Sequence, residues 1–209
     1  MAQATLLRIH PDNPQPKAIA QAVEVLRKGG LVIYPTDTIY GLGCDIHNAR
    51  AVERLCQLRG INPAKAHLSF ICHDLTHISD YAKISTQTYK VMKKALPGPF
   101  TFVLEASSRV PKVGGKRKET VGIRIPDNNI SLSLVRELGN PIVSTSIHDE
   151  DEVVEYTTDP ELIYEKYRHL VDLVIDGGFG NNVASTVVNC ENDEFDVLRQ
   201  GAGVIEEFL

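Results

Sequence analysis

The chain has 209 residues, of which 43% are hydrophobic and 23% charged, and its formal net charge at pH 7 is −5. This composition excludes extended disorder and is sufficient for a sizeable core. The acidic balance argues against a surface that is basic throughout, as in a non-specific nucleic-acid binder. No apolar run reaches the length of a membrane span, so no membrane partner is expected. We predict a single domain over residues 1–209.

The predicted elements alternate between helices and strands along the chain. Up to residue 104 they are a helix over Lys17–Lys28, a strand over Leu31–Tyr34, a helix capped by Asn48, a strand over Leu68–Cys72, a helix capped by Ser85 and a strand over Phe100–Leu104. Beyond it they are a strand over Val121–Ile125, a helix over Ser131–Leu138, a strand over Ile142–Ser146, a helix starting at Asp159-Pro160-Glu161, and strands over Val171–Ile175, Ser185–Asn189 and Asp196–Arg199. The spacing is not that of regular βαβ units. It favours an α/β (α+β) fold, with a twisted mixed sheet and flanking helices, over a Rossmann domain.

The cysteine and histidine patterns predict no bound metal. The cysteines are Cys44, Cys56, Cys72 and Cys190. They form no CxxC pair and no zinc spacing, and three lie in or beside apolar runs, which favours buried, reduced thiols. His73 and His77 come closest to ligand spacing, but their segment is expected to be a loop or helix edge, so we interpret the pair as coincidence. Residues Met1 to Arg8 lack the order of a secretion signal, and a cytoplasmic protein is expected.

Three polar residues follow the predicted strand that ends at Tyr34, within the nonapeptide PTDTIYGLG at residues 35–43. Pro35 ends the strand because proline has no N–H for the ladder. Thr36, Asp37 and Thr38 are thus offered where open α/β sheets bind ligands. The glycines of this stretch allow positive φ or close approach of the backbone to a ligand. An ordinary turn, in which the threonines satisfy their own backbone, is the alternative.

Further motifs extend over nearly the whole chain. They are LPGPFTFVL at 96–104, VGIRIPD at 121–127, PIVSTS at 141–146, DGG at 176–178, ASTVV at 184–188 and LRQG at 198–201. Together with PTDTIYGLG, and in this order, they resemble the YrdC/YciO-like family, whose enzymes make threonylcarbamoyl-adenylate. The resemblance implies a YrdC/RibB-like open, twisted mixed sheet with a concave groove.

The resemblance also implies an activity of the nucleotidyl-transfer type. L-Threonine, bicarbonate and ATP, with Mg²⁺, would give threonylcarbamoyl-AMP and pyrophosphate for the threonylcarbamoyladenosine modification of tRNA. Such chemistry needs positioned reactants, neutralised phosphate charge and exclusion of water, so no side chain is assigned a covalent or acid–base role. The chain contains no GxGxxG or GxxxxGK[ST] loop, so nucleotide binding would depend on isolated side chains and backbone amides. A monomer or weak dimer is expected.

Motif matches imply particular site residues. The substrate-binding residues would be Thr36, Tyr40, Arg124 and Ser146. The nucleotide-binding residues would be Arg59, Thr101, Ser144, Ser185, Thr186 and Arg199. Structural alternatives stay open for several of them. Arg59 suits a helix end, Ser185 and Thr186 suit an ordinary strand, and the charge of Arg124 needs either an internal carboxylate or a ligand.

Several residues depart from the pattern of the family's enzymes, and the departures resemble the YciO branch. Gln57 stands where the enzymes carry a lysine, and Ser146-Ile147-His148 stands where they carry Ser-Ala-Asn. An acidic run, from Asp149 to Glu155, follows. The resemblance therefore allows weak or altered synthase activity. The alternative is a non-catalytic module that binds double-stranded RNA or tRNA, with a basic run on the rim of the groove at Lys112, Lys116, Arg117 and Lys118.

Overall fold

The computed structural model describes residues 3–147 and 157–209. Within them, ten strands form one sheet: β1 (Thr5–Arg8), β2 (Val32–Tyr34), β3 (Gly41–Asp45), β4 (Ser69–Ile71), β5 (Phe100–Glu105), β6 (Thr120–Arg124), β7 (Ile142–Ser146), β8 (Leu173–Asp176), β9 (Thr186–Asn189) and β10 (Asp196–Arg199). The α-helices are α1 (Pro16–Arg27), α2 (Ala49–Leu58), α3 (Thr86–Ala95), α4 (Asn129–Leu138) and α5 (Pro160–Tyr167). Short 3₁₀ helices are η1 (Pro63–Lys65), η2 (Ile78–Asp80), η4 (Glu191–Asp193) and η5 (Ile205–Glu207).

The sheet is open and mixed, in the order β1-β8-β2-β3-β7-β4-β6-β5-β9-β10. The β1–β8, β8–β2, β4–β6 and β5–β9 pairs are parallel, and the other pairs are antiparallel. The predicted mixed sheet with flanking helices is therefore confirmed. None of the helices within the described ranges combines the length and apolarity that a bilayer crossing requires.

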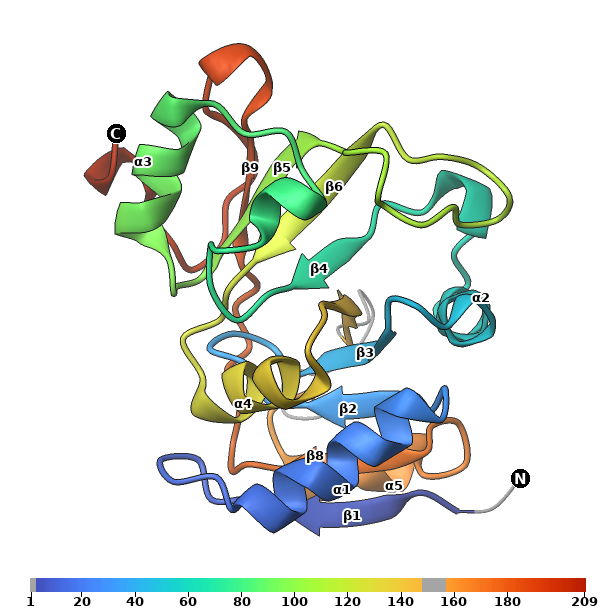
Figure 1. Ribbon diagram of the computed structural model, residues 1–209. Coiled ribbons are helices and arrows are strands. Elements are labelled where there is room, and N and C mark those ends of the chain that lie inside the picture. The colour runs from blue at the N-terminus through green and yellow to red at the C-terminus, as the bar shows by residue number, and fades with distance from the viewer. Residues whose placement is uncertain (1–2, 148–156) are drawn as a thin grey trace.

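Helices cover both faces of the sheet. Figure 1 shows α1 and α4 side by side on one face of β2 and β8. Their apolar stripes, with Val23 and Leu134 at the centre, pack on the buried side chains of Val32 and Ile175. The other helices contribute to the larger core cluster. This arrangement leaves one face of β7, β4, β6, β5, β9 and β10, which are neighbours in this order, for a cleft.

Two strands were missing from the elements predicted from sequence. β1 pairs with β8 at one edge of the sheet, and β3 pairs with β2 and β7. β3 begins Gly-Leu-Gly, and glycine has low strand propensity, so its sequence does not predict a strand. Gly41 and Gly43 are not among the residues with positive φ. Of the two alternatives for these glycines, positive φ is therefore wrong.

The predicted helices were confirmed, with small shifts at their ends. Pro16 is the first residue of α1, where proline is favoured because its missing N–H is not needed. α4 begins at Asn129, ahead of the predicted start, because Asn128 caps it by accepting hydrogen bonds from the N–H groups of Ile130 and Ser131. All four cysteines are buried and free of disulfides, as expected.

Candidate functional site

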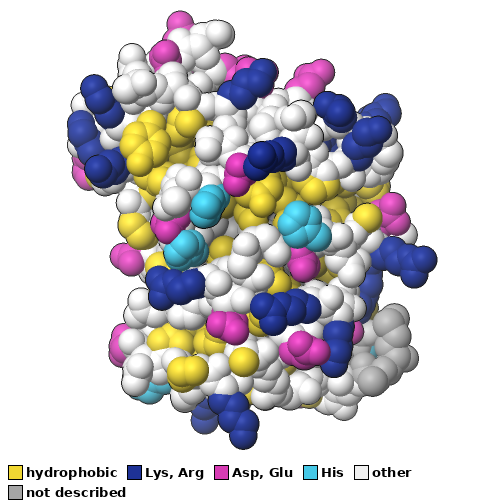
Figure 2. All heavy atoms as spheres, in the orientation of Figure 1, with side chains coloured by type: hydrophobic (Ala, Val, Ile, Leu, Met, Phe, Trp, Pro, Cys, Tyr) yellow, Lys and Arg dark blue, Asp and Glu magenta, His cyan; other side chains and the backbone are white. Residues whose placement is uncertain are grey.

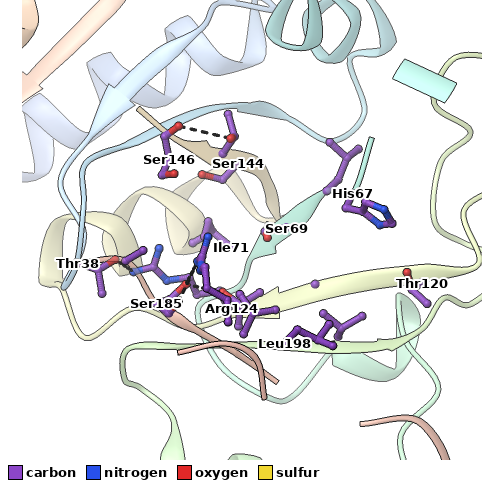
Figure 3. Close-up of a pocket in the computed structure, with 18 of the residues that line it drawn as sticks. Thr38, His67, Ser69, Ile71, Thr120, Arg124, Ser144, Ser146, Ser185 and Leu198 are labelled. Carbon is purple, nitrogen blue, oxygen red and sulfur yellow. Dashed lines mark hydrogen bonds between the residues drawn. The ribbon is translucent and has the colours of Figure 1, made fainter. Parts of the chain in front are cut away.

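A cleft of about 540 Å³ lies over the part of the sheet that the helices leave open. On β4, β5, β6 and β9 the lining residues alternate, since every second side chain of a strand points to the same face, whereas β7 and β10 contribute consecutive residues. They come from β4, β5, β6, β7, β9 and β10, and from the segments around Thr38 and Ala184. Figure 3 shows Thr38, Arg124 and Ser185 toward one end, with His67 and Thr120 toward the other.

The floor of the cleft follows a row of aligned residues across five neighbouring strands. In sheet order the register partners are Ser144, Ser69, Gly122, Val103 and Asn189. All five line the cleft. A Cβ on Gly122 would lie 3.0 Å from Oγ of Ser69 and 3.1 Å from Cγ2 of Thr101. The missing side chain therefore keeps the middle of the floor deep.

Ser144 is held from behind by a buried tyrosine. The hydroxyl of Tyr34 and Oγ of Ser144 form a hydrogen bond of 2.5 Å. β3 runs between them in the sheet, and its glycines make room: a Cβ on Gly41 would lie 2.8 Å from the Tyr34 ring, and one on Gly43 would lie 2.4 Å from Ile142. The close approach predicted for these glycines is thus made to protein side chains. Burial raises the pKa of Tyr34 to about 12, so the hydroxyl is neutral at pH 7.

Arg124, at the end of β6, is bound by the PTDT segment. Its Nη2 lies 2.7 Å from Oδ1 of Asp37, 2.5 Å from Oγ1 of Thr38 and 3.1 Å from Oγ1 of Thr36. The side chains of Arg124 and Asp37 are each 11% exposed. Of the two alternatives for this charge, an internal carboxylate is therefore present, although Arg124 still lines the cleft.

Arg199 lies on β10, across the cleft from β7 in the order of the sheet. Its Nη2 donates to the carbonyl of Ser185 at 2.9 Å and approaches Oγ of Ser185 at 3.5 Å. Oγ of Ser185 in turn lies 2.9 Å from Oγ1 of Thr101. Burial and, to a smaller degree, the charge of Arg124 lower the pKa of Arg199 from its ordinary value.

The structure brings together most of the residues predicted for substrate and nucleotide. The predicted residues that line the cleft are Thr101, Arg124, Ser144, Ser146, Ser185 and Arg199. Thr36 does not line the cleft; it is buried and contacts Arg124, which does. Arg59 is the C-cap residue of α2 and does not line the cleft. The roles themselves stay predictions.

Two of the predicted residues have hydrogen bonds that hold the backbone. The hydroxyl of Tyr40 donates to the carbonyl of Gly178 at 2.7 Å and accepts from the N–H of Gly177 at 3.1 Å. Oγ1 of Thr186 donates to the carbonyl of Gly203 at 2.6 Å and accepts from the N–H groups of Gly201 and Gly203. Neither residue lines the cleft. Ser185, by contrast, does.

Sequence reasoning missed several lining residues. Thr38 belongs to the nonapeptide PTDTIYGLG and was noted only as a polar residue of the turn. Ser69, Thr120 and Asn189 follow the two-residue period of their strands, a signal that could have placed them on the face of Gly122. His67 lies in the connection before β4, where no periodicity predicts its direction. His148 and the acidic run lie outside the described residues.

The predicted basic run lies in the connection between β5 and β6. Lys112, Lys116 and Arg117 are exposed, whereas Nζ of Lys118 donates to the carbonyls of Pro63 at 2.8 Å and Ala64 at 3.1 Å. None of the four lines the 540 Å³ cleft. On the face drawn in Figure 2, basic and acidic side chains are interspersed.

No group of three or more His, Cys, Asp or Glu side chains suited to a metal occurs in the part of the chain that the structure describes. His73 pairs with Asp74, Nε2 to Oδ2 at 3.0 Å, and His77 pairs with Asp80, Nδ1 to Oδ2 at 3.8 Å. The two histidines thus have separate partners.

The chain is an α/β protein with an open mixed sheet, and the cleft over that sheet carries two arginines and several hydroxyls. The Sua5/YciO/YrdC family model, described as telomere recombination, matches residues 24–201, and the chain belongs to this family. It is 39% identical over 203 residues to the uncharacterized protein YciO of Escherichia coli K12, covering 96% of this chain and 97% of that protein. The crystal structure of E. coli YciO matches with a TM-score of 0.89 and 38% identity, covering 99% of this chain and 100% of that one.

More distant matches include proteins with a named activity or ligand. The threonylcarbamoyl-AMP synthase of Bacillus subtilis is 33% identical over 203 residues, covering 94% of this chain and 56% of that protein. The structure of P. abyssi Sua5 complexed with L-threonine matches with a TM-score of 0.86 and 29% identity, covering 98% of this chain and 59% of that one.

Proposed function

We propose that the cleft binds ATP and L-threonine and forms threonylcarbamoyl-AMP, or a closely related acyl-adenylate, with release of pyrophosphate. The observation that carries this proposal is the convergence of Arg124 and Arg199 with the hydroxyls of Ser144, Ser146 and Ser185 in one cleft. Guanidinium groups and hydroxyls are suited to carboxylates and phosphates. The names of the B. subtilis synthase and of the threonine-bound P. abyssi protein support the choice of substrates.

The chain's own contribution would be positioning and charge stabilisation. Cationic charge in the cleft, above all that of Arg199, would counter the negative charge that grows as pyrophosphate leaves. Serine and threonine hydroxyls on rigid strands orient the reactants, and the depth of the floor at Gly122 keeps a bound molecule away from bulk water. Mg²⁺ bound to the nucleotide would supply further charge neutralisation. Bicarbonate would provide the carbamoyl carbon.

The direct test is pyrophosphate release from ATP and Mg²⁺ in the presence of threonine and bicarbonate. We expect release to require both co-substrates, each omission serving as a control. Ser146→Ala is expected to reduce the rate at least about tenfold through a lost hydrogen bond to substrate. Ser79→Ala, at an exposed serine in η2, is the matched control and should leave the rate unchanged. A well-folded protein that releases no pyrophosphate contradicts the proposal.

A second candidate is the binding of double-stranded RNA or tRNA. The observation that favours it is the exposure of Lys112, Lys116 and Arg117 on one connection. Replacing these three with alanine would then weaken RNA binding and flatten its dependence on salt concentration. RNA affinity that is unchanged in this triple variant, but lost in Arg199→Gln, would place the RNA in the cleft instead.

A further inference from the structure

The two arginines of the cleft have different partners. Arg124 is paired with the carboxylate of Asp37, and both side chains are largely shielded from water. Arg199 donates to oxygens of Ser185, which carry no formal charge. Within the described ranges, no carboxylate lies within ion-pair distance of Arg199. One cation of the cleft is therefore compensated, and the other is not.

We propose that Asp37 is a positioning residue that fixes the guanidinium of Arg124 and cancels its charge, so that Arg199 is the cation that attracts anionic groups into the cleft. The inference rests on the proposed function in one respect: the ligand carries phosphate. It assigns different tasks to the two arginines. Arg199 contributes the charge that attracts anions, whereas Arg124, paired with Asp37, adds no net charge to the cleft.

The geometry of the pair supports a positioning role. All hydrogen bonds of Arg124 within the described residues leave from Nη2, whose acceptors are the carboxylate and two threonine hydroxyls. Nε of Arg124 and Oδ2 of Asp37 are buried without a partner. The pair is thus not a two-pronged salt bridge, in which both groups would be fully used. Three acceptors around one nitrogen fix the rotation of the guanidinium and leave its Nη1 outside this cluster.

The loop that carries the acceptors is itself held in place. The Nδ2 group of Asn181 donates to the carbonyl of Asp37 at 3.0 Å, and the N–H of Asn181 donates to the carbonyl of Thr38 at 3.2 Å. Oγ1 of Thr36 donates to the carbonyl of Ile39 at 2.7 Å and accepts from the N–H of Thr38 at 3.0 Å. The carboxylate is therefore presented to Arg124 from a preorganised segment.

Electrostatics give the pair its second role. Opposite charges 2.7 Å apart act on a more distant ligand as a small dipole, because their Coulomb terms nearly cancel. Arg199 has no carboxylate within ion-pair distance among the described residues, although Glu191 also lines the cleft, so its charge is compensated less than that of Arg124. A residue with only a structural task would not affect anion affinity in this directional way. Removing the carboxylate charge should therefore increase attraction for anions.

The experiment measures binding of inorganic pyrophosphate by calorimetry at two salt concentrations, without ATP, threonine or bicarbonate. Asp37→Asn keeps the size and an acceptor oxygen but removes the charge, and we expect roughly tenfold tighter binding with a steeper salt dependence. Arg199→Gln should bind roughly tenfold more weakly. The double variant Asp37→Asn/Arg124→Gln replaces an ion pair of zero net charge by two uncharged side chains. Its affinity for pyrophosphate should stay within about twofold of that of the wild type. Asp37→Glu, which retains the charge, should not gain affinity.

Unchanged or weaker pyrophosphate binding by a folded Asp37→Asn protein would overturn the charge-cancelling role. Loss of affinity in a folded double variant would also overturn it, because Arg124 would then attract anions directly. The double variant keeps the test valid if Asp37→Asn alone fails to fold. If no folded variant and no wild-type protein binds pyrophosphate, the proposal is wrong. The proposed synthase reaction is judged separately, by its dependence on threonine and bicarbonate.

Discussion

The hydroxyl of Tyr34 lies 2.5 Å from Oγ of Ser144, although a whole strand, β3, runs between their two strands. The contact spans β3 because two of its residues, Gly41 and Gly43, have no side chain to obstruct the ring. Ser144, in the floor of the cleft, is thereby fixed by a tyrosine of β2 that is fully buried. Gly41 and Gly43 thus affect the cleft indirectly, by making room for the tyrosine that holds Ser144.

A side chain on Gly43 should disturb both packing and site. In Gly43→Ala the new Cβ would lie 2.4 Å from Cγ2 of Ile142 and 2.9 Å from the ring of Tyr34. We expect a loss of about 1–3 kcal/mol in the free energy of unfolding, since overpacking a core forces neighbours to shift. Urea denaturation measures this loss. Stability equal to that of the wild type would show that both Ile142 and the ring of Tyr34 can shift without cost.

Removing only the tyrosine hydroxyl separates packing from hydrogen bonding. Tyr34→Phe retains the ring over β3 but leaves Oγ of Ser144 without this partner. We expect a loss of about 0.5–1.5 kcal/mol, as for one buried hydrogen bond, and weaker binding of any ligand that contacts Ser144. Ser133→Ala, on α4 outside the cleft, provides a comparison for hydroxyl loss. Nucleotide affinity that is equal in Tyr34→Phe and wild type would contradict a role for Tyr34 in the site.

Arg124→Ala should be much more destabilising than Thr36→Ala. The arginine substitution leaves the carboxylate of Asp37 buried without its counter-charge, for which we expect about 3–5 kcal/mol. Loss of Oγ1 of Thr36 removes hydrogen bonds of the turn and should cost about 1 kcal/mol. Thermal unfolding of the two variants tests the difference. Similar unfolding free energies would show that the pair is more solvated than its burial indicates.

The stability of the protein should fall as the pH rises from about 9 toward 12. Burial raises the pKa of Cys44 and Cys72 to about 12, compared with 9.0 when unperturbed, and that of Tyr34 from 10.0 to about 12. The folded state therefore keeps protons that the unfolded state releases in this range. Each group lowers the unfolding free energy by up to about 1.4 kcal/mol per pH unit there. Urea titrations at pH 8, 9 and 10 measure the slope, and a flat profile would contradict it.

The same burial predicts inert thiols in the native protein. At pH 8 we expect none of the four cysteines to react in the fast phase with an aromatic disulfide reagent, because only the thiolate attacks. All four should react after unfolding in guanidinium chloride, which serves as the control. A fast-reacting thiol in the native state would identify a residue that becomes accessible through local opening.

Two neighbouring lysines of the basic run should behave differently. Lys118→Ala removes two hydrogen bonds to carbonyls around η1 and should cost about 1–2 kcal/mol of stability. Lys116→Ala, at an exposed side chain, should change stability by less than about 0.5 kcal/mol. Chemical denaturation of both variants measures the two changes in the free energy of unfolding. Equal stability would mean that the contacts of Lys118 to η1 are not maintained in solution.

The sequence supports the fold and the general position of the site, because helix caps, prolines and strand periodicity are local signals. It did not predict β3, because Gly41 and Gly43 stand where strands usually have larger side chains. These two positions are glycine to make room for the ring of Tyr34. It left open which group compensates Arg124, because residue 37 lies far from it along the chain and only sheet order brings them together. It also could not distinguish Ser185, in the cleft, from Thr186, whose hydroxyl holds the turn at Gly201 and Gly203.

The row from Ser144 to Asn189 has a consequence for how the cleft arises. Its five members come from five strands whose order in the sheet differs from their order in the chain. No hairpin or contiguous fragment contains the floor, so a ligand has nothing to bind until the long-range pairings have formed. Ligand binding and folding are therefore thermodynamically coupled, and any true ligand must raise the melting temperature by an amount that keeps growing with the logarithm of its concentration above Kd.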